Sequence, residues 1–200
     1  DYGAALAQLA GMDLVYPCFC TRADIAAEIA AAGAAPHGPD GPLYPGTCRR
    51  LDPGFRAERL ARGDGHAFRL DVAKASALSG QPSWHDRDRG PQTAAPETLG
   101  DVVLARKDVP TSYHLAVTVD DHLQGVTLVT RGEDLFAATH VHRLLQSLLG
   151  LSTPEFHHHR LLTDTEGRRF AKRDRALTLR ALREAGHSPT EVRAMAGFGA

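Results

Sequence analysis

The sequence has no long apolar run and almost no net charge. None of its 200 residues belongs to a stretch of about 18 consecutive apolar residues, so no membrane-spanning helix is expected. The formal net charge of −1 gives no general basic character, so any contact with nucleic acid must come from local clusters of lysine and arginine. The start at Asp1 lacks an initiator methionine and the basic, apolar pattern of a signal peptide, and we expect the true start to precede this chain.

Two kinds of catalytic motif are also missing. The chain has no Ser-His-Asp order that would support a nucleophilic triad, and no Walker-type phosphate loop. Three cysteines are an odd number for the disulfide framework of a secreted protein, so we expect a cytoplasmic protein whose cysteines bind a metal. With 42% apolar residues, a chain of this length can bury the core of one or two domains.

The order of the predicted elements indicates an α/β fold. Apolar periodicity and stop signals predict helices at 4–10, 21–32, 53–62, 135–149 and 177–185. Strands are predicted at 14–20, 67–72, 100–104, 113–119, at a segment ending at 130–132, and at 156–162. Loops are predicted at 34–48, 79–98 and 163–174. Because strands alternate with helices in the second half, we expect a parallel sheet there.

The strongest functional signal lies between Tyr113 and Glu133. We interpret this stretch as two strands joined by a polar turn at 120–122, with Tyr113 opening the first strand and Arg131 closing the second. Ligands of open α/β sheets bind outside the carboxyl ends of the strands, where a guanidinium clamps a carboxylate with two parallel hydrogen bonds. The alternative is a surface arginine paired with Glu133 or Asp134.

The cysteines are spaced like metal ligands. Cys18 and Cys20 lie two residues apart in an extended segment, so both thiols share one face, and Cys48 follows a loop that can fold back. Three thiolates suit tetrahedral zinc, which needs a fourth ligand, and the chemistry of common ligands nominates His37. The alternative is three buried cysteines without metal.

Three consecutive histidines follow later in the chain, at 157–159 inside a predicted strand. Alternate residues of a strand point to opposite faces, so at most His157 and His159 converge. We expect this run to have a mainly structural role.

The segments Tyr113–Val117, Val119–Asp121 and Arg131–Leu135 resemble, in order and spacing, the second half of the catalytic domain of class I glutamyl-tRNA synthetases. The resemblance implies that Tyr113 and Arg131 bind glutamate. It also implies a Rossmann-like catalytic half-domain at 111–200 and a zinc-stabilised α+β insertion at 1–110. The family's first ATP motif belongs to a preceding strand–helix unit, so we expect this chain alone to be inactive.

The pattern Cys18-x-Cys20, then Tyr44-x-x-x-Cys48, is similar to the zinc site of the glutamyl-Q tRNA(Asp) synthetases, where a tyrosine oxygen is the fourth ligand. The resemblance implies one structural zinc held by Cys18, Cys20, Tyr44 and Cys48, and it favours Tyr44 over His37. The segment between Cys20 and Tyr44 is long for this family, so His37 remains an alternative.

A basic segment at 167–174 resembles the KMSKS loop of class I synthetases, and Lys172 matches the second lysine of that motif. The resemblance implies that Lys172 contacts ATP phosphates. Arg169, Ala171 and Arg173 depart from the family's pattern. The alternative is a solvated basic turn.

The resemblance as a whole implies a cytoplasmic, monomeric enzyme that uses ATP with Mg²⁺ to activate glutamate and attaches it to queuosine in the anticodon loop of tRNA(Asp). Ordinary members that carry zinc end the ligand set with Cys-x-His, whereas Cys48 is followed by two arginines here, which favours the glutamyl-Q enzymes. The alternatives are a fragment of an ordinary glutamyl-tRNA synthetase and a non-catalytic, zinc-stabilised tRNA-binding protein.

Overall fold

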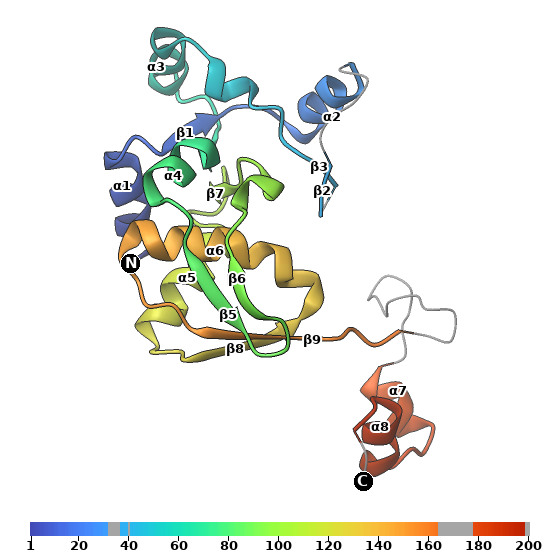
Figure 1. The fold of residues 1–200 in the computed structure, drawn as a ribbon. Helices are drawn as coiled ribbons and strands as arrows, with labels where there is room; N and C mark the ends of the chain where they lie inside the picture. Colours follow the sequence, from blue (N-terminus) through green and yellow to red (C-terminus); the bar gives the residue numbers. More distant parts are fainter. Residues whose placement is uncertain (32–36, 40, 164–177, 199–200) are drawn as a thin grey trace. The chain divides into compact units, whose positions relative to one another are not determined.

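A computed structural model describes residues 1–31, 37–39, 41–163 and 178–198. The chain divides into two compact units, Asp1–His158 and His159–Ala200 (Figure 1). The helices of the first unit are α1 Tyr2–Gly11, α2 Arg22–Ala31, α3 Pro53–Ala61, α4 Val72–Ser79, α5 Tyr113–Leu123 and α6 Phe136–Leu149. The second unit contains α7 Leu179–Glu184 and α8 Pro189–Met195. No helix among the described residues is long and apolar enough to cross a membrane.

The strands form two main sheets and a small hairpin. Their bounds are β1 Val15–Cys18, β2 His37–Gly38, β3 Gly41–Pro42, β4 Ala67–Leu70, β5 Ser83–Asp86, β6 Gly90–Thr93, β7 Val103–Ala105, β8 Leu128–Gly132 and β9 Glu155–His159. Short 3₁₀ turns lie at η1 Thr47–Arg50, η2 Pro96–Leu99 and η3 Glu133–Leu135.

The first sheet is antiparallel, in the order β1-β4-β7. Its register pairs Val15 with Leu70 and Cys18 with Ala67, so Cys18 lies at the end of a fully paired edge strand. This pairing fixes the backbone from which the thiol of Cys18 projects.

The second sheet has the order β6-β5-β9-β8 and is mixed. Strands β5 and β9 are parallel, with Asp86 opposite Phe156, whereas β5 and β6 form an antiparallel hairpin. The parallel sheet expected from the second half of the chain is thus found only in part. The sheet is mixed, and β5, which runs parallel to β9, comes from the segment predicted as a loop at 79–98. The sheet order places Asp86, His158 and Arg131 on three successive strands.

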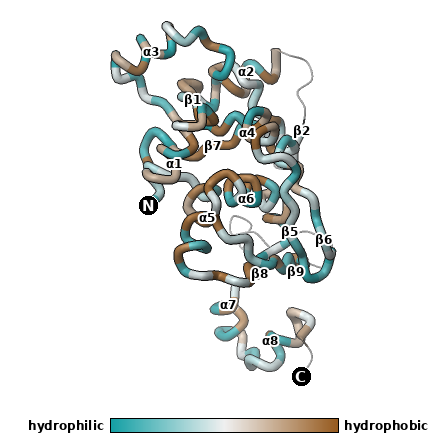
Figure 2. The backbone as a smooth tube through the Cα atoms, turned by 60° about the vertical axis from the view of Figure 1, so that its left-hand side comes forward, coloured by the Kyte–Doolittle hydropathy of each residue, from teal (hydrophilic) through white to brown (hydrophobic). Residues whose placement is uncertain are grey.

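The main hydrophobic core surrounds α6. Val141, Leu144 and Leu145 of this helix are fully buried against residues of α1, β4, β7 and α5. Figure 2 shows apolar residues along α5 and α6. The core draws on residues from both sides of position 110, such as Leu70 and Leu115.

Several predicted helices are confirmed with small shifts of their ends. The helix expected at 135–149 is α6, and it stops at Gly150, whose φ of 68° is the left-handed conformation that favours glycine. The helices expected at 4–10, 21–32, 53–62 and 177–185 correspond to α1, α2, α3 and α7.

The strand predicted at 113–119 is wrong, because this segment is helix α5. Ser112 caps it by accepting a hydrogen bond from the N–H of Leu115. Leu115, Thr118 and Val119 are buried along one helical face, and the Thr118 hydroxyl donates to the carbonyl of His114 at 2.8 Å. Packing of this face thus overrides the strand preference of the β-branched residues.

The loop predicted at 79–98 is also wrong, because it contains the β5–β6 hairpin. Ser83 pairs with Thr93 and Asp86 with Gly90, and Trp84 and Asp86 are buried on one face of β5. The expected strand at 67–72 ends at Leu70, after which Asp71 caps helix α4, an element that the sequence did not reveal.

The small hairpin β2–β3 and the turn η1 lie within the segment predicted as a loop at 34–48. Helix α8 was not predicted either. The charged loop expected at 163–174 lies, after residue 163, outside the described residues, and so does Lys172.

Candidate functional site

Arg131 and Tyr113 lie together in the structure, as the sequence predicts. Arg131, on β8, donates a hydrogen bond from Nη1 to the hydroxyl oxygen of Tyr113 at 3.2 Å. Tyr113 is the first residue of α5, so it reaches the site from a helix N-terminus and not from a strand. Its side chain is half exposed, which leaves this face of the pair open to a ligand.

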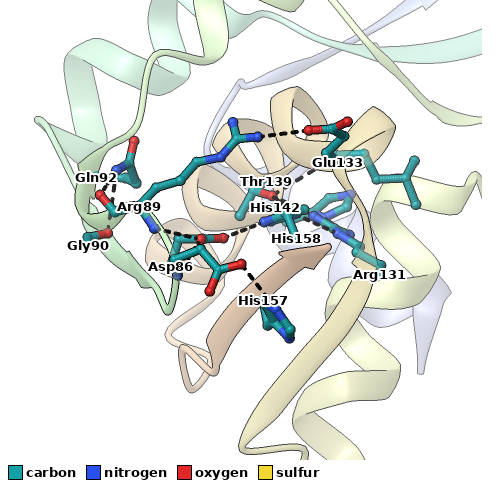
Figure 3. A network of polar contacts seen from close by, with 12 residues as sticks. Asp86, Arg89, Gly90, Gln92, Arg131, Glu133, Thr139, His142, His157 and His158 are labelled. Carbon is teal, nitrogen blue, oxygen red and sulfur yellow. Dashed lines mark hydrogen bonds and ion pairs between the residues drawn. The ribbon is translucent and has the colours of Figure 1, made fainter. Parts of the chain in front are cut away.

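Three further side chains hold the Arg131 guanidinium (Figure 3). Its Nε donates to Nε2 of His158 at 3.0 Å, and its Nη2 donates to Oγ1 of Thr139 at 2.5 Å. Its Nη1 lies 3.3 Å from Nδ1 of His142. The carboxylate of Glu133, one of the two partners in the alternative interpretation of Arg131, lies 3.3 Å from the guanidinium of Arg89.

His158 is in turn held by Asp86. Nδ1 of His158 lies 2.6 Å from Oδ2 of Asp86, and both side chains are fully buried. The other oxygen, Oδ1, accepts the backbone N–H groups of Asp88 and Arg89, each at 3.1 Å. Burial raises the pKa of the Asp86 carboxyl, but the bonds from His158 and the two amides outweigh it, so the net pKa is lowered and Asp86 is a carboxylate.

The two histidines that contact Arg131 are neutral. Burial is the largest cause that lowers the pKa of His158, and it outweighs the hydrogen bond to Asp86, which raises it. Burial, followed by the charge of Arg131, holds the pKa of His142 well below 6.5. Nε2 of His142 lies 3.2 Å from Nδ1 of His114, which extends the network to α5. Neutral imidazoles accept hydrogen bonds, so they orient the guanidinium without repelling it.

A cavity of about 1070 Å³ begins at this network and extends toward the cysteines. Tyr113 and His114 line one part of it, and Cys20 and Tyr44 line another. The cations that also line it are Arg22, Arg69, Arg106 and Lys107. The carboxylates of Asp101 and Asp108 line it as well, and Asp108 is paired with Arg106. Cations still outnumber anions along the wall, so the cavity favours an anionic ligand.

The three cysteines converge on one point. The Sγ atoms of Cys18, Cys20 and Cys48 all lie within 4.8 Å of one another, and those of Cys20 and Cys48 are 3.4 Å apart. The phenol oxygen of Tyr44 lies 3.4 Å from Sγ of Cys18 and 3.7 Å from Sγ of Cys20. Zinc bonds of about 2.3 Å in a tetrahedron separate ligand atoms by about 3.8 Å, so these four side chains fit a zinc ion.

The chemistry of this set also suits a cation. Burial, and then the hydrogen bond with Cys48, raise the pKa of Cys20 to about 12, and burial likewise raises the pKa of the Tyr44 phenol. A bound metal would favour the thiolate and phenolate forms of these two groups. The backbone N–H of Cys48 donates to the phenol oxygen at 2.9 Å, which stabilises negative charge there. His37 is exposed on β2 and is not part of the cluster.

Sequence reasoning missed Asp86, Thr139, His142 and His158. The alternation of β9 contained a usable signal, because it places Phe156 and His158 on the buried face and His157 and His159 on the other. The role of Asp86 had no such signal, since its segment looked like a charged loop and its partner lies 72 residues away.

Comparisons with known proteins agree with the geometry. The family "tRNA synthetases class I (E and Q), catalytic domain" matches residues 2–197. The chain is 46% identical to the glutamyl-Q tRNA(Asp) synthetase of Rhodobacter capsulatus, over 98% of this chain and 72% of that protein. It is 44% identical to the enzyme of that name from Nocardia farcinica, over 97% of this chain and 58% of that protein.

A solved structure is similar as well. The glutamate-tRNA synthetase from Elizabethkingia anophelis matches with a TM-score of 0.69 and 26% identity, over 93% of this chain and 36% of that one. This chain spans 72% and 58% of the lengths of these two glutamyl-Q relatives. The chain therefore belongs to the class I tRNA synthetases of the glutamyl and glutaminyl type, within the family of the glutamyl-Q tRNA(Asp) synthetases.

Proposed function

We propose that the protein containing this chain activates glutamate with ATP and Mg²⁺ and transfers it to queuosine in the anticodon loop of tRNA(Asp). The observation that carries this proposal is the contact between Arg131 and Tyr113, because Tyr113 lines the cavity and Arg131 bonds to its hydroxyl. The family and its glutamyl-Q relatives support the choice of reaction and acceptor.

The pair is suited to bind one carboxylate of glutamate. A guanidinium has five N–H donors, and the contacts to His158, Tyr113, His142 and Thr139 use four of them. One Nη2–H donor is left for a ligand. Tyr113 accepts a bond from Arg131, so its own O–H group is left to donate to the same carboxylate. We therefore propose that Arg131 and Tyr113 each donate one hydrogen bond to the carboxylate, in place of two parallel hydrogen bonds from the arginine alone.

Activation requires no nucleophile from the protein. An oxygen of the substrate carboxylate attacks the α-phosphorus of ATP. The bond between this phosphorus and the oxygen that bridges to the β-phosphate breaks, and pyrophosphate leaves. The protein contributes by holding the carboxylate in place and by stabilising phosphate charge. Lys172, outside the described residues, is proposed to contact the ATP phosphates as the lysine of a KMSKS-like loop.

The cysteine cluster is proposed to hold one structural zinc with Cys18, Cys20, Tyr44 and Cys48 as ligands. Bound zinc would join the end of β1 to η1, and four protein ligands leave no open position for catalysis. We further propose residues 1–110 as the zinc-stabilised, tRNA-contacting part and 111–200 as the second half of the catalytic domain.

The tRNA is proposed to bind at the cationic side of the cavity. Arg106 and Lys107 line it and can neutralise backbone phosphates. The anticodon loop is single-stranded, so its wobble base can be splayed out and recognised by its edges. We propose a cytoplasmic monomer as the working form.

Exchange of pyrophosphate into ATP, measured on the full-length protein, tests this proposal. Glutamate-dependent exchange without tRNA supports the glutamyl-Q reaction. Exchange only with tRNA would support an ordinary glutamyl-tRNA synthetase, and no exchange in either case would support a non-catalytic tRNA-binding protein.

Labelled glutamate then identifies the acceptor. The label should appear on tRNA(Asp) that contains queuosine and not on tRNA(Asp) with guanosine at that position. Equal labelling of both would contradict the proposed acceptor.

A further inference from the structure

We propose that Asp86 and His158 are positioning residues that hold the Arg131 guanidinium in the orientation that binds the substrate carboxylate. This inference rests on the proposed function, in which Arg131 and Tyr113 bind glutamate. Neither Asp86 nor His158 needs to touch glutamate, since they act through Arg131.

The three side chains form a continuous line across the mixed sheet. Asp86 is the last residue of β5, His158 lies on the neighbouring strand β9, and Arg131 lies on β8 beyond it. The distances are 2.6 Å from Asp86 to His158 and 3.0 Å from His158 to Arg131 (Figure 3). Strand pairing therefore sets the spacing, and no flexible loop separates the members.

The hydrogen bonds are consistent with only one tautomer of His158. Nε of Arg131 always carries a proton and must donate, so Nε2 of His158 is the acceptor. The ring proton of the neutral imidazole is then on Nδ1, from which it is donated to Oδ2 of Asp86. Asp86 thus fixes the tautomer that Arg131 requires, as carboxylates do for metal-bound histidines.

Charge supports the same arrangement. Asp86 and His158 have no exposed side-chain surface, and the carboxylate is compensated by two backbone N–H groups and by Nδ1–H of the imidazole. The charge of Arg131 lies on the far side of that imidazole. The Asp86 carboxylate and the Arg131 guanidinium thus lie on opposite sides of a neutral imidazole ring. Their attraction favours the position of the guanidinium against His158.

The guanidinium is fixed on every nitrogen. His158 holds Nε, Thr139 holds Nη2, and Tyr113 with His142 holds Nη1. A long side chain held in this way loses little freedom when it binds a carboxylate. His158 is the member that fixes the inner edge of the guanidinium, and Thr139 also lies 3.1 Å from its Nε2.

The chain offers a matched control one residue away. His157 and Asp88 form a second histidine–carboxylate pair at 3.2 Å, on the other face of β9. Their side chains are 35% and 62% exposed, and His157 points away from the face of β9 on which His158 meets Arg131. Asp88→Asn and His157→Gln therefore remove a similar pair without affecting the proposed line.

Asp86→Asn is the main variant. Its amide oxygen can still accept the two backbone N–H groups, so its NH₂ group faces Nδ1 of His158. The imidazole must then carry its proton on Nε2, opposite the Nε–H donor of Arg131. We expect the glutamate KM in pyrophosphate exchange to rise by about tenfold or more, with the ATP KM within about twofold, because a charged hydrogen bond is misaligned. Asp88→Asn and His157→Gln should leave both values unchanged.

Two variants of His158 separate hydrogen bonding from packing, and they also decide the matter if Asp86→Asn fails to fold. His158→Gln keeps an acceptor oxygen near the Nε2 position, whereas His158→Leu fills the space without one. Glutamate KM should rise by about threefold in the first variant and about tenfold or more in the second. Equal effects of Gln and Leu would overturn the proposal.

The ¹⁵N shifts of the His158 ring provide a readout that does not depend on activity. In the full-length, zinc-loaded protein they should report Nδ1–H in the wild type and Nε2–H in Asp86→Asn. Nε2–H in the wild type, or an unchanged glutamate KM in folded Asp86→Asn, would overturn the positioning role. If the wild type lacks glutamate-dependent exchange, the proposed function fails, and the ring shifts still decide whether Asp86 orients His158 toward Arg131.

Discussion

The hydroxyl oxygen of Tyr113 lies 3.2 Å from Nη1 of Arg131, although the two residues come from different kinds of element. Tyr113 begins helix α5, and Arg131 lies near the end of strand β8. The positive end of the α5 dipole and the guanidinium therefore favour the same ligand, a negatively charged one.

Tyr113→Phe should weaken glutamate binding without changing the fold. The variant removes the hydroxyl that accepts from Arg131 and that is proposed to donate to the carboxylate. The loss of about 1 kcal/mol should raise the glutamate KM by about fivefold in pyrophosphate exchange. Tyr2→Phe is the control, because its hydroxyl bonds to Asp120 and not to Arg131. Equal glutamate KM values for Tyr113→Phe and the wild type would show that this hydroxyl does not bind the carboxylate.

Tyr44→Phe should lower zinc affinity. The phenol oxygen lies 3.4 Å from Sγ of Cys18 and 3.7 Å from Sγ of Cys20, so it is placed to be the fourth ligand. We expect Tyr44→Phe to reduce bound zinc under chelator competition, and Cys48→Ser to release it and lower the melting temperature by several degrees. Zinc content measured by atomic emission and thermal unfolding provide the two readouts.

His37→Asn is the control for the fourth ligand. Because His37 lies outside the cluster, its variant should keep zinc as the wild type does. Zinc lost from His37→Asn and kept by Tyr44→Phe would reverse the assignment of the fourth ligand.

Acid should destabilise the protein partly through His142. Burial holds the pKa of His142 well below 6.5, so below about pH 6.5 the unfolded chain binds a proton that the folded protein does not. The stability from this group is complete above about pH 6.5 and is lost as the pH falls toward the folded-state pKa. Between about pH 7.5 and 5.5, the wild type should lose about 1 kcal/mol more than His142→Gln in urea unfolding.

His159→Gln, at the exposed end of β9, should retain the wild-type difference between the two pH values. If His142→Gln and the wild type lose the same stability on acidification, then His142 does not stay neutral in the folded protein.

Lys172→Ala should slow activation. The resemblance of 167–174 to a KMSKS loop predicts that this lysine stabilises phosphate charge as pyrophosphate departs. We expect kcat of exchange to fall by about tenfold or more while the melting temperature stays the same. Normal exchange kinetics in Lys172→Ala would show that this basic segment is a solvated turn.

Residue types and spacing were sufficient to predict the cysteine cluster, and the family resemblance of the stretch from Tyr113 to Leu135 predicted the Arg131–Tyr113 pair. In both cases few residues carry the chemistry, and their spacing survives errors in the secondary structure. Tyr113 was expected on a strand and lies on a helix, yet it still meets Arg131. The helix was missed because Val117 and Val119 favour strands, while the burial of Leu115, Thr118 and Val119 that selects the helix depends on tertiary packing.

The line from Asp86 through His158 to Arg131 was beyond sequence reasoning for a different reason. Because of Pro82 and Pro91, the segment that forms the β5–β6 hairpin was predicted as a loop, since proline disfavours regular strands when only the local sequence is considered. Pro91 nevertheless lies on β6, opposite His85 of β5. Because β6 is an edge strand, the missing N–H of the proline is tolerated there. Without that hairpin, Asp86 had no predicted position beside His158.

The glutamate KM of Arg131→Ala tests the central claim most directly. The measurement is pyrophosphate exchange on the full-length protein, with Arg87→Ala, which loses only an exposed pairing with Glu155, as the control. Loss of a charged hydrogen bond of about 2–3 kcal/mol should raise the glutamate KM by roughly 30- to 150-fold, with the control unchanged. A glutamate KM in Arg131→Ala equal to that of the wild type would contradict the claim that this arginine binds the substrate.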